Sequence, residues 1–63
     1  MPKLIYRDKE WEVPADITVR EAIQQIGLAP EMVLAVRGRK LVPEETLLKA
    51  DDVIKLMAMV AGG

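Results

Sequence analysis

The sequence contains neither cysteine nor histidine, and this absence excludes several classes of small protein. Without cysteine, a disulfide framework and an iron–sulfur cluster are both ruled out. Without either residue type, the chain also has no ligand set for a structural zinc. Serine is missing as well, so no Ser–His or Cys–His pair is available for nucleophilic catalysis. We therefore expect a chain that is not an enzyme and that binds no metal and no cofactor of its own.

Aromatic residues are also few, and the chain has no large excess of either charge. Tyr6 and Trp11 are the only aromatic residues, and nine basic residues nearly balance ten acidic ones, for a net charge of −1. With both rings expected to be buried, this composition favours neither nucleic acid nor an anionic membrane as a partner. No apolar run approaches the ~20 residues that span a bilayer, and the N-terminus lacks the features of a signal peptide. The expected location is cytoplasmic.

The sequence does contain enough apolar residues for one small core. Its 63 residues are 51% apolar, which fits a single domain. A core of this size seldom contributes more than about 3–5 kcal/mol, and no disulfide or metal is available to add to it. We expect a chain that is monomeric when free and stabilised by the packing of its aliphatic side chains, its methionines and its single tryptophan.

The first half of the chain predicts a hairpin followed by a helix. Residues 4–7 and 10–13 read as two strands joined by a tight turn at residues 8–9, and the second alternates polar and apolar residues like a half-buried strand. Thr18 and Glu21 form a capping-box pattern, which marks the start of a helix. The apolar residues that follow, at i, i+3, i+4 and i+7, form one stripe: Val19, Ala22, Ile23 and Ile26. Gly27 can close this helix.

The second half predicts three more strands, at residues 32–36, 40–42 and 53–60. Between the last two, Leu47 and Leu48 are the expected anchors of a polar connector. The right-handed crossover rule favours residues 32–36 as a central strand parallel to one of the first two. The order predicts an α+β fold: a ubiquitin-like β-grasp domain over residues 1–60. It would have a mixed four- to five-stranded sheet with one helix packed across one face.

The last strand is expected to have two different faces. Ile54, Leu56 and Ala58 should face the helix, because the opposite orientation would drive Lys55 toward the core without a partner. Lys55, Met57 and Met59 then lie on the outer face of the sheet. They are either scattered surface residues or a docking patch, since flexible thioethers suit a surface that meets several partners.

The chain ends in Ala61-Gly62-Gly63, and we expect residues 61–63 to form a flexible tail. An α-carboxylate is ionised at neutral pH and is a poor electrophile. A partner that uses ATP can convert it into an acyl-adenylate, whose carbonyl then accepts sulfur or an amine. Glycines without side chains would let the tail thread a narrow channel in that partner and bring the carbonyl of Gly63 to the nucleotide.

Other polar clusters suggest no chemistry. Two pairs of adjacent carboxylates, at residues 44–45 and 51–52, lie in turn-like segments, and adjacent side chains do not generally converge on an acid/base or metal site. Arg37, Arg39 and Lys40 form a small basic cluster. It reads as a solvated turn, with docking of an acidic partner as the alternative.

Together these segments resemble the ThiS/MoaD sulfur carriers of thiamine and molybdopterin synthesis. The similarity covers nearly the whole chain and is carried by four segments: Val33–Val36, Leu41-Val42-Pro43, Asp51 to Leu56, and Val60-Ala61-Gly62-Gly63. The spacing from Val-Pro to an Asp-containing turn and a terminal Ala-Gly-Gly is closest to ThiS. Arg37-Gly38 departs from the Asn-containing turn that is common in that family.

The resemblance implies a carrier. An E1-like adenylyltransferase, using ATP and Mg²⁺, would adenylate the carboxylate of Gly63. A sulfurtransferase or cysteine desulfurase would then supply the sulfur of a thiocarboxylate. A sulfur-accepting synthase would use that sulfur, with the thiamine thiazole as the first expectation and molybdopterin or tRNA thiolation as alternatives.

Two other functions are compatible with the same pattern. A ubiquitin-like protein modifier would join Gly63 to lysines through isopeptide bonds, and this role can coexist with sulfur transfer. A non-catalytic β-grasp binding module, such as an RNA-binding or regulatory domain, would leave the Gly-Gly end without a role.

Overall fold

The computed structural model describes residues 1–59. The end of the last predicted strand, Val60, and the predicted tail at residues 61–63 lie outside the described residues. The described chain forms five strands, one α-helix and one turn of 3-10 helix. These are β1 (Lys3–Tyr6), β2 (Lys9–Glu12), α1 (Val19–Gln25), η1 (Pro30–Met32), β3 (Val33–Arg37), β4 (Lys40–Val42) and β5 (Val53–Ala58).

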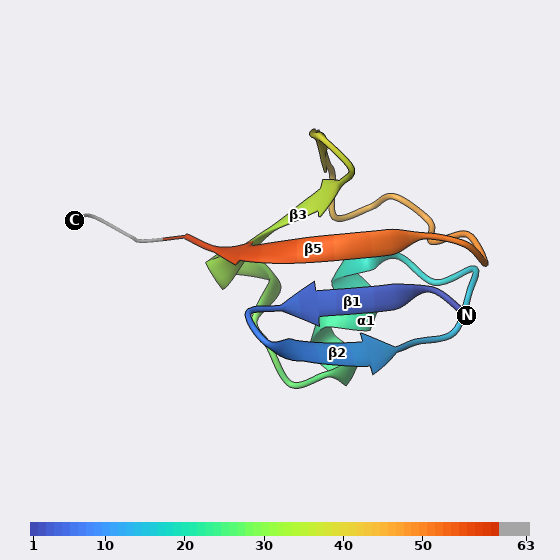
Figure 1. Cartoon of the computed structure of the whole chain (residues 1–63), viewed down its shortest axis with the longest axis horizontal. Coiled ribbons are helices and arrows are strands. Elements are labelled where there is room, and N and C mark those ends of the chain that lie inside the picture. Colours follow the sequence, from blue (N-terminus) through green and yellow to red (C-terminus); the bar gives the residue numbers. More distant parts are fainter. Residues whose placement is uncertain (60–63) are drawn as a thin grey trace.

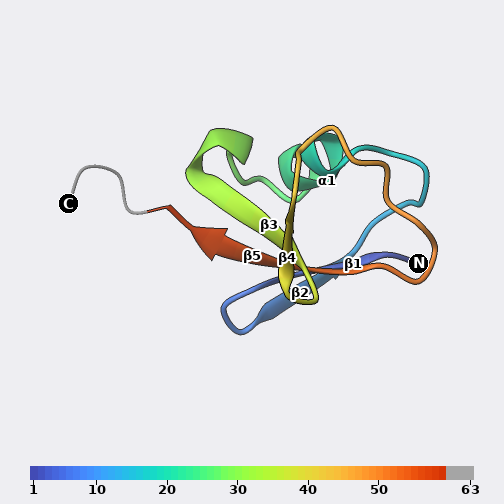
Figure 2. The same cartoon turned by 90° about the horizontal axis from the view of Figure 1, so that it is seen from above.

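The strands form one mixed sheet in the order β2-β1-β5-β3-β4. Strand β1 pairs parallel with β5, and the other neighbouring pairs are antiparallel. Helix α1 lies behind the sheet in Figure 1 and forms a separate layer above it in Figure 2. This five-stranded β-grasp confirms the predicted fold class.

The central strand of the sheet is β5, so the predicted central position of residues 32–36 is wrong, whereas the predicted direction is confirmed because β3 runs parallel to β2. Strand β3 runs antiparallel to β5, and it is separated from the first two strands by β5 itself. The crossover rule concerns parallel strands that become neighbours, and here the last strand enters between the two halves of the sheet. That place suits β5, because Ile54 and Leu56 are almost completely buried and its ladder is then paired on both sides.

The β1–β2 turn lies one residue earlier than predicted. Tyr6 pairs with Lys9, so the two loop residues are Arg7 and Asp8 rather than residues 8–9. The favoured two-residue turns need a positive φ at their first central residue, and Arg7 adopts a φ of 57°. The sequence offers no glycine or asparagine at this position, which is why the turn could not be placed from the residue types.

Helix α1 begins as the capping-box pattern predicts. The amide N of Glu21 donates to Oγ1 of Thr18 at 3.1 Å, and the amide N of Thr18 donates to Oε1 of Glu21 at 3.0 Å. At the other end, Gly27 takes a φ of 87° and its amide donates to the carbonyl of Gln24 at 3.1 Å. The cap fixes which face of the short helix meets the sheet.

The core lies between the helix and the inner face of the sheet. Its buried residues come from every part of the chain: Leu4, Val13, Val19, Ala22, Ile23, Val33, Ala35, Leu48, Ile54 and Leu56. The anchor prediction is confirmed for Leu48, which is fully buried, and is wrong for Leu47, whose exposed fraction is 57%. The backbone explains the choice, because Leu48 exchanges hydrogen bonds with Asp16 and Ile17 and so turns its side chain inward.

The two aromatic residues are only half-buried, although both were expected to be buried. Tyr6 and Trp11 pack against the edge of the core at the end of the hairpin. Helix α1 ends at Gln25, so only Ile26 and the loop that follows it cover this end of the sheet. The short helix therefore leaves one face of each ring accessible.

Asp52 joins three segments at the other end of the sheet. Its Oδ2 accepts a hydrogen bond from Nη2 of Arg37 at 2.8 Å and another from the amide N of Lys49 at 2.8 Å. Its backbone carbonyl accepts from the amide N of Lys3 at 2.9 Å. This carboxylate holds the start of β5 between β1 and β3. Residues 51–52 thus form the predicted turn, and Arg37 separates from the proposed basic cluster.

Replacing this carboxylate tests its structural role. We expect Asp52→Ala to lower the free energy of unfolding by about 1–3 kcal/mol, because it removes a charge-assisted hydrogen bond and leaves two donors without their acceptor. Urea unfolding followed by circular dichroism measures the change. The matched control is Asp51→Ala at an exposed position of the same turn, with an expected change within about 0.5 kcal/mol. Equal effects of the two substitutions would contradict this assignment.

Candidate functional site

The candidate site is the end of β5 together with the outer face of the sheet. Because β1 and β3 both pair with β5, the direction in which this strand leaves the sheet is fixed by two ladders. Beyond Ala58, the backbone N of Met59 donates to the carbonyl of Met32 at 2.9 Å. The residues expected to carry the chemistry, Ala61, Gly62 and Gly63, lie outside the described residues.

The predicted orientation of β5 is confirmed from Ile54 to Met57 but not beyond, because Ala58 is exposed and Met59 lines a hollow together with Val19 and Ile23 of the helix. Ile54 and Leu56 face the helix and are buried, whereas Lys55 and Met57 lie on the opposite, exposed face. Met57 has an exposed fraction of 52%, and Met59, which follows the strand, has one of 38%. All three predicted docking residues are therefore accessible to a partner.

The sequence did not identify the neighbours of these residues on the outer face. Leu34 lies directly opposite Met57, and Val36 lies opposite both Lys55 and Leu41. Residues that pair directly across a sheet project from the same face. Exposed apolar side chains on this face thus form an outer-face patch around Lys55, consisting of Leu34, Leu41, Val53 and Met57.

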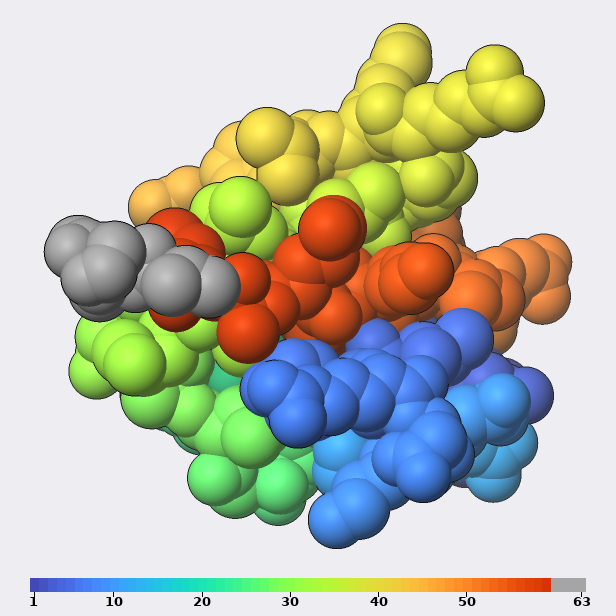
Figure 3. Space-filling view, turned by 60° about the vertical axis from the view of Figure 1, so that its left-hand side comes forward, coloured from blue at the N-terminus to red at the C-terminus, as the bar shows by residue number. Residues whose placement is uncertain are grey.

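Figure 3 displays this arrangement from one side. Strand β5, in red, runs between the blue hairpin and the green and yellow strands β3 and β4. The patch was missed because strand pairing, unlike face alternation, is not encoded locally. Leu34 and Leu41 belong to short strands, and only the position of β5 beside β3 brings them next to Met57.

Charged side chains of both signs border the patch on the side of β1 and β2, where Lys3 lies opposite Val53 and Glu10 lies opposite Ile5. Lys55 lies among the apolar side chains of the patch. Within residues 1–59, Lys3 forms an ion pair with Glu10 at 3.4 Å, whereas Lys55 takes part in no ion pair. An exposed apolar surface with one central cation suits a partner surface that is apolar and carries an acidic group. The patch can bind a partner and has no means of performing chemistry itself.

Within residues 1–59, no group of three or more acidic side chains is placed to hold a metal ion. In the same part of the chain, no helix is long and apolar enough to cross a membrane. The fold and site thus define a β-grasp domain whose central strand leads toward the chain end beside an apolar surface.

Comparison with known proteins assigns this domain to a family. Residues 2–63 match the ThiS family. The chain is also 36% identical over 55 residues to the sulfur carrier protein TtuB of Thermus thermophilus, a similarity that covers 87% of this chain and 85% of that protein. The chain belongs to the ThiS family, and it is a sulfur carrier without catalytic activity of its own. Both findings confirm the resemblance drawn from the sequence.

The two faces of β5 can be compared with substitutions at neighbouring positions. We expect Leu56→Ala to lower the free energy of unfolding by about 2–5 kcal/mol, because it empties part of the core. Met57→Ala should change it by less than about 1 kcal/mol, because half of that side chain is already in water. Urea unfolding measures both, and a larger loss for Met57→Ala would show that the faces are assigned the wrong way round.

Proposed function

We propose that this chain carries sulfur as a thiocarboxylate at Gly63, after activation of that carboxylate by an E1-like adenylyltransferase. The observation that carries the proposal is the family match, which runs to residue 63 and so includes the terminal glycines. The position of β5 supports it, because the strand that leads to these glycines is held on both sides by the sheet. A partner can then grip a rigid domain while it acts on the chain end.

The proposed activation has two steps. An oxygen of the Gly63 carboxylate attacks the α-phosphorus of ATP, and pyrophosphate leaves with the electrons of the broken P–O bond. A persulfide sulfur from a sulfurtransferase or cysteine desulfurase then attacks the carbonyl carbon, and AMP leaves. A thiol reductant cleaves the resulting S–S bond, is oxidised to a disulfide, and frees the thiocarboxylate. Mg²⁺ and ATP belong to the activating partner.

We assign partner docking to the outer-face patch, together with Lys55 and Met59. Two of its exposed apolar side chains, Val53 and Met57, lie on β5, the strand that leads to the reacting terminus, so a partner that covers the patch also controls where the tail enters its active site. Positioning of a reacting group by remote contacts is an established way to lower a barrier. The same patch would serve the activating enzyme and the sulfur-accepting synthase in turn.

We propose the thiamine thiazole as the acceptor of the sulfur, with molybdopterin and thiolated tRNA as the alternatives to be compared. The support is the similarity of the C-terminal segment to ThiS. We also place the carrier in the cytoplasm, where its activating partner has ATP. Deletion of the gene should cause a thiamine requirement that thiazole relieves, with molybdoenzyme activity and thiolated nucleosides measured alongside.

Removal of the last residue tests the role of the terminus. We expect deletion of Gly63 to abolish thiocarboxylate formation, measured as the oxygen-to-sulfur mass change of the intact protein from its native host. The melting temperature should change by less than about 2 °C, because the last residues of a chain generally contribute little packing. An unmodified terminus in the full-length protein, with Gly-Gly remnants on lysines of other proteins, would instead support the modifier function.

Charge inserted into the patch tests docking. We expect Met57→Glu to raise the KM of the adenylyltransferase for the carrier about tenfold or more, because the partner would have to bury a carboxylate against an apolar surface. The kcat should change little, since the loss affects binding and leaves the chemical step intact. The matched control is Leu47→Glu, which places the same charge at an equally exposed leucine outside the patch. A similar KM for both variants would remove the patch from the docking site.

A further inference from the structure

A second concave surface lies at the β1–β2 turn, on the helix side of the sheet. Its walls are the rings of Tyr6 and Trp11 on one side and the side chains of Ile26 and Leu28 on the other, and Arg7, Asp8 and Lys9 border it. We call it the hairpin groove. Its volume is about 360 Å³, which is enough for one or two side chains of a partner. It exists because α1 ends at Gln25 and leaves these rings half-covered.

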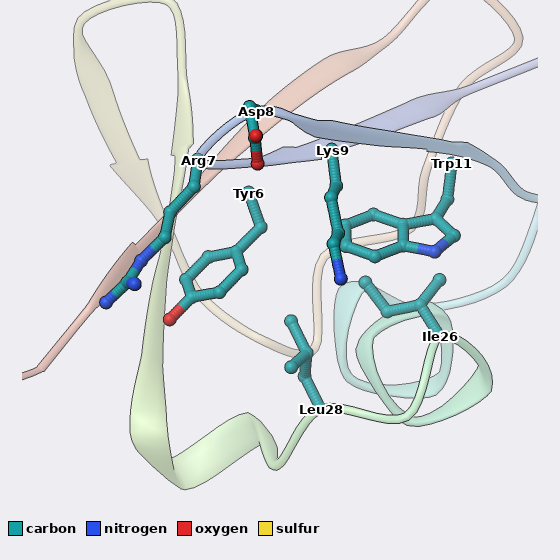
Figure 4. A pocket seen from close by; sticks show the side chains of 7 residues that line it. All are labelled: Tyr6, Arg7, Asp8, Lys9, Trp11, Ile26 and Leu28. Atoms are coloured by element: carbon teal, nitrogen blue, oxygen red, sulfur yellow. The ribbon is translucent and has the colours of Figure 1, made fainter.

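The polar atoms around the hairpin groove are mainly hydrogen-bond donors. Figure 4 shows the side chain of Lys9 reaching down between Tyr6 and Trp11 toward Ile26 and Leu28. The guanidinium carbon of Arg7 lies 5.4 Å from the centre of the Tyr6 ring. Within residues 1–59, no ion pair engages either cation. With Asp8 on the turn counted, the border carries a net charge of +1.

This combination is complementary to a carboxylate next to an apolar group. The ammonium of Lys9, which lies between the two rings in Figure 4, can donate to a carboxylate oxygen, and the guanidinium of Arg7 beside the Tyr6 ring adds a second positive charge at the border of the groove. Between and below them, the rings and the two aliphatic side chains offer an apolar wall. A carboxylate held near the low-dielectric rings interacts with the cations more strongly than it would in open water.

The hairpin groove lies at the end of the sheet from which the chain terminus leaves. Strands β1 and β5 are parallel, and Tyr6 is paired with Leu56. Arg7 is therefore level with Met57 across the sheet. In Figure 1 the β1–β2 turn lies at the same end of the molecule as the end of β5. A partner that binds the end of β5 therefore lies at the same end of the sheet as this turn.

From this geometry we infer that the hairpin groove is a second contact site for the activating enzyme. It receives an aspartate or glutamate side chain of that enzyme together with an adjacent apolar side chain. This inference rests on the proposed function, because it assumes that an E1-like enzyme acts on Gly63. Its effect is to hold the domain at two points, the outer-face patch on one side of the sheet and the hairpin groove on the other, so that the domain cannot rotate about β5.

Single-stranded RNA is the other polymer that uses cations and aromatic rings together. The rest of the surface argues against it, because a chain with net charge −1 offers no continuous basic track for a phosphate backbone. A single carboxylate needs only one local cation, such as Lys9, so the observations favour a protein partner.

The single tryptophan gives a direct measurement of occupancy. The carrier is labelled with 5-fluorotryptophan, which places one fluorine signal in the hairpin groove, and is mixed with unlabelled E1-like adenylyltransferase encoded in the same genome. We expect the fluorine resonance to shift or broaden on binding. Addition of a uridine decamer at the same concentration should leave it unchanged, and a salt-dependent shift with the decamer alone would overturn the inference.

Kinetics of adenylation, followed as pyrophosphate release, provide the second readout. We expect Lys9→Glu to raise the KM for the carrier about tenfold or more and Lys9→Gln to raise it about threefold, with kcat nearly unchanged, because charge contacts in a docking site affect binding and leave the chemical step intact. The matched control is Lys49→Glu, since Lys49 is an exposed lysine in the turn before β5, at the opposite end of the sheet. Melting temperatures of the two charge reversals verify that both fold.

The outcomes separate this inference from the proposed function. A raised KM for Lys9→Glu alone, with the fluorine shift, supports the contact. Equal KM values for Lys9→Glu and Lys49→Glu, with normal adenylation of the natural carrier, overturn the inference and leave the proposed function intact. Failure of the enzyme to adenylate the natural carrier at all overturns both.

Discussion

The pairing of β5 with a neighbour on each side is the constraint on which the rest of the structure depends. The parallel ladder to β1 and the antiparallel ladder to β3 unite the two halves of the chain into one sheet. They also fix the two faces of β5, so that Ile54 and Leu56 complete the core while Lys55 and Met57 remain outside. One strand thus serves both the stability of the domain and the presentation of its terminus, and a change on one face need not disturb the other.

Stability in so small a domain is concentrated at the points where β5 is fixed. The core is formed by ten buried residues, the chain has no cysteine for a disulfide, and within residues 1–59 no cluster of side chains could hold a metal ion. Asp52 therefore has an importance beyond a surface charge, because its carboxylate and backbone connect the start of β5 to its neighbours on both sides. The chemically relevant end of β5 carries no comparable set of contacts within residues 1–59, which leaves it accessible to a partner.

The sequence predicted what depends on local pattern, and it was less successful with what depends on distant pairing. The capping box at Thr18 and Glu21, and the alternation in β5, were read correctly because each is encoded within a few residues. The strand order was not, since nothing within residues 32–36 indicates that β5 will enter between them and the hairpin. For the same reason the outer-face patch and the hairpin groove, which join distant segments, needed the fold. The chemistry proposed for the terminus rests on the glycines and on the family resemblance, and its residues lie outside those that the structure describes.

The strand order also determines which strands form the two edges of the sheet and are open to pairing with strands of other chains. Its outermost strands are β2 and β4, which have four and three residues. Strand β2 is lysine and glutamate except for Trp11, and β4 begins with Lys40 and is followed by Pro43, which has no amide hydrogen to donate. Short, charged borders of this kind resist edge-to-edge association. The exposed apolar patch therefore need not lead to aggregation between encounters with successive enzymes. The two edge strands are too short and too charged for a strand of another chain to pair with them readily.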